Sequence, residues 1–187
     1  NGLLAINLII INIILIYINV QNANVELSFF IIGQVVILIS FLLFNFPNAK
    51  IFLGDSGSYL FGSLTALNTV ITNNLNPNYS SFFFCILLFY IFFEVFFSFI
   101  RKVVQKKSPI HPDDKHLHML TFEKISVKFG RDKGNYLNSV LINTVYSILV
   151  VPALLFAKDP LLSRNWFFCL IIIYLLIYFR LYRLTKN

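Results

Sequence analysis

Five runs of apolar residues dominate the chain, and short polar segments separate them. They cover about 3–20, 27–44, 81–100, 139–157 and 166–184. A helix needs roughly 20 mostly apolar residues to cross the hydrocarbon core of a bilayer. Each run is close to that length, so the pattern predicts an all-α membrane protein rather than a soluble domain.

A sixth run, about 59–75, is more polar than the others. It contains small and hydroxyl-bearing side chains, among them Gly62, Ser63 and Thr65. Such residues allow helices to pack closely within a bilayer. We therefore predict an interior helix here. The whole chain, 1–187, is then one transmembrane domain, a polytopic helical bundle of about six membrane-spanning helices.

The composition agrees with this interpretation. The chain is 58% hydrophobic and only 12% charged, whereas soluble domains carry about 25% charged residues. The net charge of +7 could indicate a nucleic-acid partner, but the basic residues gather at the ends of the apolar runs. That distribution is typical of membrane topology, so we expect membrane lipid and no nucleic acid as a partner.

The basic residues also predict which side of the membrane each loop occupies. With six spans, the segments 45–58, 101–138 and the C-terminal tail share one side and contain thirteen Lys and Arg residues. The segments on the other side, 21–26, 76–80 and 158–165, contain two. Lys and Arg are enriched in cytoplasmic loops. We therefore expect the segments 45–58 and 101–138 to be cytoplasmic loops, and any active face to be cytoplasmic.

One polar stretch in the first of these loops is a candidate site. Gly54 and Gly57 flank Asp55 and give the backbone freedom, and Ser56 or Ser58 could cap a helix that starts near residue 59. A carboxylate beside a helix N-terminus, which attracts anions, suits a bridging Mg²⁺ that also binds phosphate oxygens. A simple helix-capping role for Asp55 is the alternative.

The second cytoplasmic loop contains all three histidines of the chain, His111, His116 and His118. Pro109 and Pro112 argue against a helix through this part of the loop. Zinc is disfavoured because no Cys and no third ligand lies at a typical spacing. Imidazoles near a phosphate can supply protons, hydrogen bonds or positive charge, and solvated loop histidines are the plain alternative.

Glu94 is an ionisable residue inside an apolar run, where charge is costly and usually faces the protein interior. It precedes Arg101 by seven residues, about two helical turns, so one helix face could carry both toward the cytoplasmic end. A purely structural hydrogen bond between helices remains an alternative function for Glu94.

Taken together, these motifs resemble the polyprenyl-phosphate N-acetylhexosamine-1-phosphate transferases, which form glycosyltransferase family 4. The stretch Pro47-Asn-Ala-Lys-Ile-Phe-Leu-Gly-Asp-Ser-Gly-Ser58 is similar to the family signature Pro-Ala-Lys-(Ile/Val)-Phe-(Met/Leu)-Gly-Asp-x-Gly-Ser. The stretch Ser108-Pro-Ile-His-Pro-Asp-Asp-Lys-His-Leu-His118 resembles the second signature, Ser-Pro-Phe-x-Pro-Asp-x-x-His-Leu-His. It favours the O-antigen branch, that of the undecaprenyl-phosphate GlcNAc-1-phosphate transferases, and leaves GlcNAc, GalNAc or a deoxy relative as the sugar. Glu94, with Ser98 and Arg101, is similar to the Glu-x-x-Phe-Ser-x-x-Arg pattern of one bacterial branch.

The resemblance implies a reaction at the bacterial inner membrane. The phosphate of undecaprenyl phosphate, or of a similar polyprenyl phosphate, attacks a UDP-N-acetylhexosamine. UMP leaves, and the lipid-linked product initiates cell-envelope polysaccharide synthesis. The cofactor implied is Mg²⁺, with Mn²⁺ as a substitute, and a homodimer is left open.

The resemblance also assigns functions to single residues. It makes Asp55 both the metal ligand and a catalytic residue, together with His116 and His118. The substrate-binding positions that it implies are Asn45, Lys50, Gly54, Ser58, Arg101, Asp113 and Lys115.

Two departures from the family pattern matter. Met119 stands where many members have a further histidine. The paired aspartates of the family would lie upstream of Asn1, and the stretch Asn1-Gly2-Leu3 resembles the end of an upstream motif. We therefore expect the chain to be the C-terminal half of an enzyme of roughly ten or eleven spans, inactive by itself. A transporter and a noncatalytic membrane scaffold are the competing hypotheses.

Overall fold

The computed structural model describes residues 2–108, 111 and 113–186. Asn1, Pro109, Ile110, Pro112 and Asn187 lie outside the described residues, and with them the two prolines expected to stiffen the histidine loop. The described part of the chain is all-α, as the apolar pattern predicts. Its elements are α1 (Leu3–Gln21), α2 (Val25–Asn45), α3 (Gly54–Leu75), α4 (Ser81–Val104), α5 (Leu117–Phe129), α6 (Arg131–Val150), the short 3₁₀ helix η1 (Val151–Phe156) and α7 (Pro160–Lys186).

Five stretches among the described residues are long and apolar enough to cross a membrane. They are α1, α2, α4, the α6–η1 stretch Arg131–Phe156, and Pro160–Thr185 of α7. Large apolar side chains on these helices face outward, for example Phe29 and Leu43 on α2. This is the pattern of a bundle whose surroundings are lipid.

The helix α3 has 22 residues but is more polar than the other long helices. Its buried residues are all polar: Thr65, Asn68, Thr69 and Thr72. Three of them, Thr65, Asn68 and Thr72, hydrogen-bond to side chains on α1 or α2. The Asn12 amide on α1 donates to the Thr65 hydroxyl at 2.9 Å, and the Asn68 amide donates to Gln34 on α2 at 2.9 Å. The prediction of an interior helix is therefore wrong for the described chain: only the polar face of α3 packs inward, and apolar side chains such as Leu60 and Val70 are exposed.

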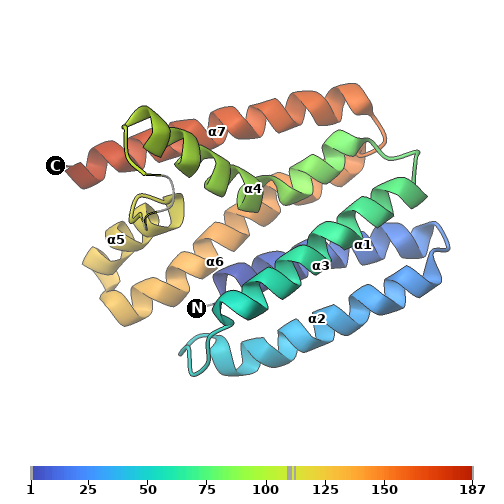
Figure 1. Cartoon of the computed structure of the whole chain (residues 1–187), viewed down its shortest axis with the longest axis horizontal. Helices are drawn as coiled ribbons and strands as arrows, with labels where there is room; N and C mark the ends of the chain where they lie inside the picture. Colours follow the sequence, from blue (N-terminus) through green and yellow to red (C-terminus); the bar gives the residue numbers. More distant parts are fainter. Residues whose placement is uncertain (1, 109–110, 112, 187) are drawn as a thin grey trace.

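The helices run back and forth along the long axis of the bundle (Figure 1). The α2–α3 connection, α5 and both chain ends lie toward one end, while the α1–α2, α3–α4 and α6–α7 connections lie at the other (Figure 1). This is the alternation predicted from the charges, with α3 running alongside α1 and α2. We call the first end the basic end, because it carries the segments rich in Lys and Arg.

Several predicted boundaries differ from the structure. The loop predicted over 45–58 is shorter, because α2 continues through Asn45 and α3 begins at Gly54. The segment predicted as a loop over 101–138 is not irregular: α4 continues to Val104, α5 lies within it, and α6 begins at Arg131. The extensions are polar or charged helix turns that continue past the apolar runs, so hydropathy alone could not detect them.

Candidate active site

The predicted site residues fall into two groups at the basic end of the bundle. The first surrounds Asp55 at the start of α3, and the second surrounds Glu94 on α4 and the histidines at the start of α5.

Asp55 lies in the first turn of α3 and is exposed. Gly54 before it has a φ of +66°, a left-handed conformation that favours glycine. Among the described residues, the Asp55 carboxylate has no hydrogen-bond or ion-pair partner. The side chain is therefore free to bind a ligand, and it stands beside the unpaired N–H groups of a helix N-terminus.

The capping prediction for this helix is wrong. Because α3 begins at Gly54, Ser56 and Ser58 lie inside its first turns, and the residue before the helix, Leu53, makes no side-chain cap. The Ser58 hydroxyl instead donates to the carbonyl of Gly54 at 2.7 Å. Gly57 is helical, and a Cβ there would lie 2.9 Å from Cγ of Leu53, so Gly57 serves close packing rather than a turn.

A pocket opens beside Asp55. Its volume is about 410 Å³, and its walls come from the start of α1, the end of α2 and the start of α3. The lining residues include Gly2, Asn45, Gly54, Asp55 and Ser58. Three of the predicted substrate-binding positions therefore line one cavity together with the predicted metal ligand.

Asn45 and Lys50 differ in their surroundings. The Asn45 side chain is buried, accepts the Gly2 N–H at 2.6 Å and donates to the carbonyl of Ile51 at 2.6 Å. It therefore ties the start of α1 to the loop before α3. Lys50 is exposed, and its backbone N–H donates to the carbonyl of Phe44. Lys50 is not among the residues that line the pocket.

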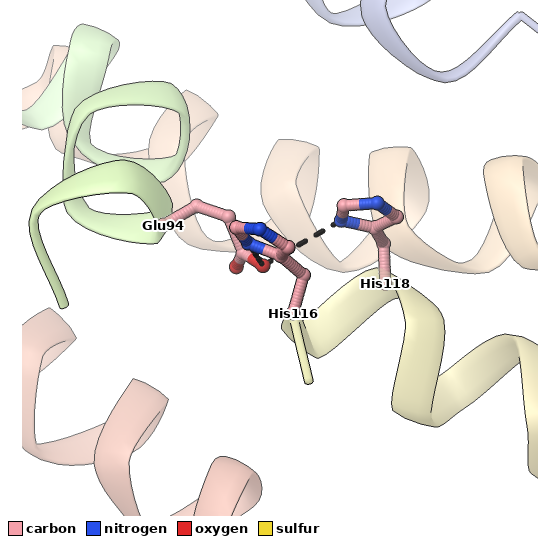
Figure 2. Close-up of side chains that lie close together, drawn as sticks. All are labelled: Glu94, His116 and His118. Atoms are coloured by element: carbon pink, nitrogen blue, oxygen red, sulfur yellow. Dashed lines mark hydrogen bonds and ion pairs between the residues drawn. The ribbon is translucent and has the colours of Figure 1, made fainter. Parts of the chain in front are cut away.

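The second group centres on the carboxylate of Glu94, which is buried in the middle of α4. Nδ1 of His116 lies 3.2 Å from Oε1 of Glu94, and Nδ1 of His118 lies 3.5 Å from the same oxygen. Figure 2 shows the His116 imidazole at the carboxylate and the His118 imidazole to one side of it, with the two rings nearly parallel. We refer to Glu94, His116 and His118 as the Glu94 trio.

Two further donors fix the position of the Glu94 carboxylate. The Leu117 N–H donates to Oε1 at 2.7 Å, and the Tyr174 hydroxyl on α7 donates to Oε2 at 2.6 Å. The carboxylate thus joins α4, α5 and α7. Since Nδ1 of each histidine faces Glu94, the other ring nitrogen, Nε2, is the one that points away from it and can meet a ligand.

A second pair ties the histidine loop to α4. Arg101 forms an ion pair with Asp113 and also donates to the Ser98 hydroxyl at 3.1 Å. Burial acts to raise the pKa of Asp113, but the hydrogen bond and charge of Arg101 outweigh it, aided by the Lys115 N–H and the Ser98 hydroxyl, and the pKa is lowered. Both side chains are about nine-tenths buried, so this pair positions the loop.

Lys115 and His111 make contacts of other kinds. The Lys115 ammonium lies 5.6 Å from the ring centre of Tyr182, and its carbonyl accepts the Tyr178 hydroxyl at 3.1 Å. The carbonyl of His111 accepts from the buried Lys102 ammonium at 2.6 Å. His111 is exposed and does not join the Glu94 trio.

The helix α6 contacts both groups. The Asn138 amide donates to the carbonyl of His118 at 2.9 Å, and the Asn143 amide donates to the carbonyl of Leu3 at 3.1 Å. The ring of Tyr136 packs edge-on against Phe46, at a centroid distance of 6.3 Å, in the loop before α3. The Asp55 pocket and the Glu94 trio are therefore two parts of one end of the bundle, connected through α6.

The sequence-based interpretation missed two participants. It considered Glu94 but did not include it among the site residues, and it did not single out Tyr174. The sequence does contain a signal for Tyr174, because Tyr174, Tyr178 and Tyr182 recur at every fourth position. In the structure their rings stack along one face of α7. Nothing local in the sequence indicates that this face meets α4.

Comparison with known proteins gives two matches. Residues 1–73 match the family model of glycosyl transferase family 4. Over 88 residues the chain is 41% identical to an undecaprenyl-phosphate alpha-N-acetylglucosaminyl 1-phosphate transferase from Thermotoga maritima. That match covers 47% of this chain and 29% of the relative. No solved structure matches the chain.

The family model includes Asn45, Lys50, Gly54, Asp55 and Ser58, whereas the Glu94 trio lies beyond its end at residue 73. The matches thus support, over part of the chain, the family that the motifs resemble: residues 1–73 are similar to glycosyl transferase family 4.

Proposed function

We propose that the chain is part of a membrane transferase that moves N-acetylhexosamine-1-phosphate from a UDP-sugar to undecaprenyl phosphate or a similar polyprenyl phosphate. An oxygen of the lipid phosphate attacks the β-phosphorus of the donor and forms a new P–O bond. The bond between the β-phosphorus and the bridging oxygen breaks, and UMP leaves with that oxygen. The product initiates a cell-envelope polysaccharide at the bacterial inner membrane, on the cytoplasmic face.

One observation supports this proposal most directly. Asp55 presents an exposed carboxylate without a partner among the described residues, beside a pocket, within the segment that matches the family. A carboxylate that only capped a helix would accept N–H groups, and Asp55 accepts none that the structure records.

The residues at this position fit Mg²⁺. This ion commonly binds proteins through one or two carboxylates, retains several waters and also contacts the substrate's phosphates. Asp55 would supply the carboxylate, and the bound ion would offset the charge of the donor diphosphate. The chain's own groups act around it: the first N–H groups of α3 attract anionic oxygens, and Ser58 and Asn45 line the pocket.

The two histidines would complete the site from the opposite side. Glu94 holds both imidazoles by their Nδ1 atoms, which leaves Nε2 of each ring to face a phosphate oxygen. A protonated ring carries an N–H on both nitrogens and would donate from Nε2 to a phosphate oxygen. Such a group stabilises the negative charge that develops at the transferred phosphate. Arg101, Asp113 and Lys115 then act by holding the loop in place.

The competing hypotheses make different predictions. A transporter would use Asp55, Glu94 and the polar face of α3 as an ion path and would release no UMP. A noncatalytic scaffold would retain the fold without turnover. The homodimer also stays a prediction.

The test compares Asp55→Asn with Asp132→Asn in membranes that contain the complete gene product, undecaprenyl phosphate, Mg²⁺ and UDP-GlcNAc or UDP-GalNAc. Asp132 is a matched control, because it is also an exposed aspartate in the first turn of a helix, here α6. We expect Asp55→Asn to lower UMP release by at least about 100-fold, because it removes a metal-ligand charge, and Asp132→Asn to retain it. Equal activity in both variants at equal expression would refute the function assigned to Asp55.

A further inference from the structure

We propose that the Glu94 trio binds one divalent transition-metal ion of the zinc class, through Oε1 of Glu94 and one nitrogen each of His116 and His118. This site is separate from the Mg²⁺ position proposed at Asp55. It does not depend on the proposed function, since the ion would bind whether or not the protein transfers a sugar phosphate. The sequence alone disfavoured zinc for lack of a third ligand, and the fold supplies that ligand from α4.

The spacing of the three side chains suits a single ion. Zinc lies about 2.0–2.2 Å from nitrogen and oxygen ligands, which places neighbouring ligands of a tetrahedral site about 3.3–3.6 Å apart. Oε1 of Glu94 is 3.2 Å from Nδ1 of His116 and 3.5 Å from Nδ1 of His118. One ligand atom from each of the three residues lies within 4.8 Å of the other two. The His118 side chain is 32% exposed, so it has room to rotate and bring its nitrogen to the distance that an ion requires.

Hydrogen bonds from neighbouring residues hold the proposed metal ligands in place. Metal-binding carboxylates are themselves hydrogen-bonded, and these partners fix their orientation. Glu94 has two such partners, the Leu117 N–H on Oε1 and the Tyr174 hydroxyl on Oε2. Both contacts can remain when Oε1 also binds an ion, because each uses a different lone pair. The backbone of His118 is held in turn by Asn138.

The chemistry of the ligands selects the type of ion. Imidazole nitrogens suit zinc, copper, iron and nickel, whereas Mg²⁺ prefers oxygen ligands and retains its waters. Two imidazoles with one carboxylate therefore favour a zinc-class ion, and the lone exposed carboxylate of Asp55 favours Mg²⁺. Three protein ligands leave a fourth position open. With the single negative charge of Glu94, the occupied site carries a net positive charge that would attract an anionic ligand.

Direct titration of the detergent-solubilised complete gene product with Zn²⁺ tests this proposal without any measurement of transfer. The protein should carry no polyhistidine tag, and Cys85→Ser and Cys169→Ser should be present throughout, because both cysteines are free. Millimolar Mg²⁺ in the buffer removes weak binding to exposed carboxylates. We expect one Zn²⁺ per chain, and Co²⁺ in its place should give the intense visible absorption of a four-coordinate site.

Variants then identify the ligands. Glu94→Gln, His116→Ala and His118→Ala should each weaken Zn²⁺ binding by at least about 100-fold, while Tyr174→Phe, which keeps all three ligands, should weaken it by about 10-fold. His111→Ala is the matched control, because His111 belongs to the same loop but lies outside the trio, and its affinity should equal that of the parent protein. Far-UV circular dichroism confirms that each variant is folded.

Either of two results would overturn the proposal. One is a parent protein that binds Zn²⁺ no more tightly than the folded Glu94→Gln variant, which would leave Glu94 only as a hydrogen-bond partner that orients the histidines. The other is an equal loss of binding in His111→Ala. Zinc binding without sugar-phosphate transfer would refute the proposed function alone, and transfer without zinc binding would refute this site alone.

Discussion

Asp55 and Glu94 are both carboxylates at the basic end of the bundle, but their surroundings differ. Asp55 is exposed and has no partner among the described residues, whereas Glu94 is buried and contacts Leu117, Tyr174 and both histidines of the trio. A buried carboxylate is retained only when it is paired or hydrogen-bonded. Asp55 is therefore suited to bind a ligand that arrives, and Glu94 to hold protein groups that are already present.

The Arg101–Asp113 pair gives a pH-dependent contribution to stability. The pKa of Asp113 is lower in the folded state than its ordinary value, so the contribution is fully present above that ordinary value, about 4. It is lost as the pH falls through the lowered pKa of the folded state. The pair thus stabilises the loop at neutral pH, and this stabilisation is lost in acid when Asp113 is protonated.

Replacement of Asp113 tests this contribution. Asp113→Asn should reduce the free energy of unfolding by about 1–3 kcal/mol at neutral pH, because it leaves the buried Arg101 without its charged partner. In thermal unfolding of the solubilised chain, the difference in melting temperature from the parent should shrink below about pH 4. Asp114→Asn, an exposed neighbour, should behave as the parent. A difference that stayed constant down to pH 3 would contradict the lowered pKa.

At the scale of elements, α5 and α6 meet at a close contact. Gly130 joins them with a φ of +80°, and Gly134 on α6 faces Ser126 on α5. A Cβ at position 134 would lie 2.5 Å from Oγ and 3.1 Å from Cα of Ser126. Because α5 begins just after His116, this contact contributes to the position of the histidines.

Gly134→Ala should therefore destabilise the protein by about 1–3 kcal/mol, since the added methyl group must push the α5 backbone away. Gly62→Ala is the matched control, because Gly62 also lies within a helix and a Cβ there meets nothing within 4 Å. That variant should be neutral or gain up to about 1 kcal/mol. Chemical denaturation in a mild detergent measures both changes, and equal effects of the two substitutions would argue against the close contact.

Hydropathy predicted the long helices well, because each places a full apolar run in lipid. It missed α5, a 13-residue helix in which polar and charged residues interrupt the apolar ones. It also placed the start of α3 near residue 59 instead of Gly54. The contact of Glu94 with His116 and His118 joins residues more than 20 positions apart. The packing of both α4 and α5 against α7 brings these residues together, so local sequence patterns could not predict the contact.

Over the whole molecule, the two ends of the bundle differ in the residues and connections that they carry. The basic end carries the Asp55 pocket and the Glu94 trio, and the other end carries short connections such as 157–159 between η1 and α7. Apolar side chains cover the outer surface between the ends, including Leu155, which is 90% exposed. The bundle is thus arranged for a ligand that approaches one membrane face.

The predicted orientation can be tested by chemical labelling. In a background with Cys85→Ser and Cys169→Ser, a single cysteine is introduced as Asp114→Cys or as Lys158→Cys, both at exposed positions. A membrane-impermeant maleimide should label position 158 in intact cells and position 114 only in inverted vesicles, because Lys and Arg are enriched on the cytoplasmic side. The reverse pattern would place the candidate site outside the cytoplasm.

The most direct test of the proposed transfer follows the donor's β-phosphate into the lipid product. Membranes with the complete gene product receive undecaprenyl phosphate, Mg²⁺ and UDP-GlcNAc labelled at the β-phosphorus. We predict that the label moves into the organic phase as a lipid-linked sugar diphosphate while unlabelled UMP appears in equal amount, and that Asp55→Asn prevents both. Label that stays in the aqueous phase, with the protein folded and inserted and every UDP-N-acetylhexosamine tried, would contradict the transferase assignment.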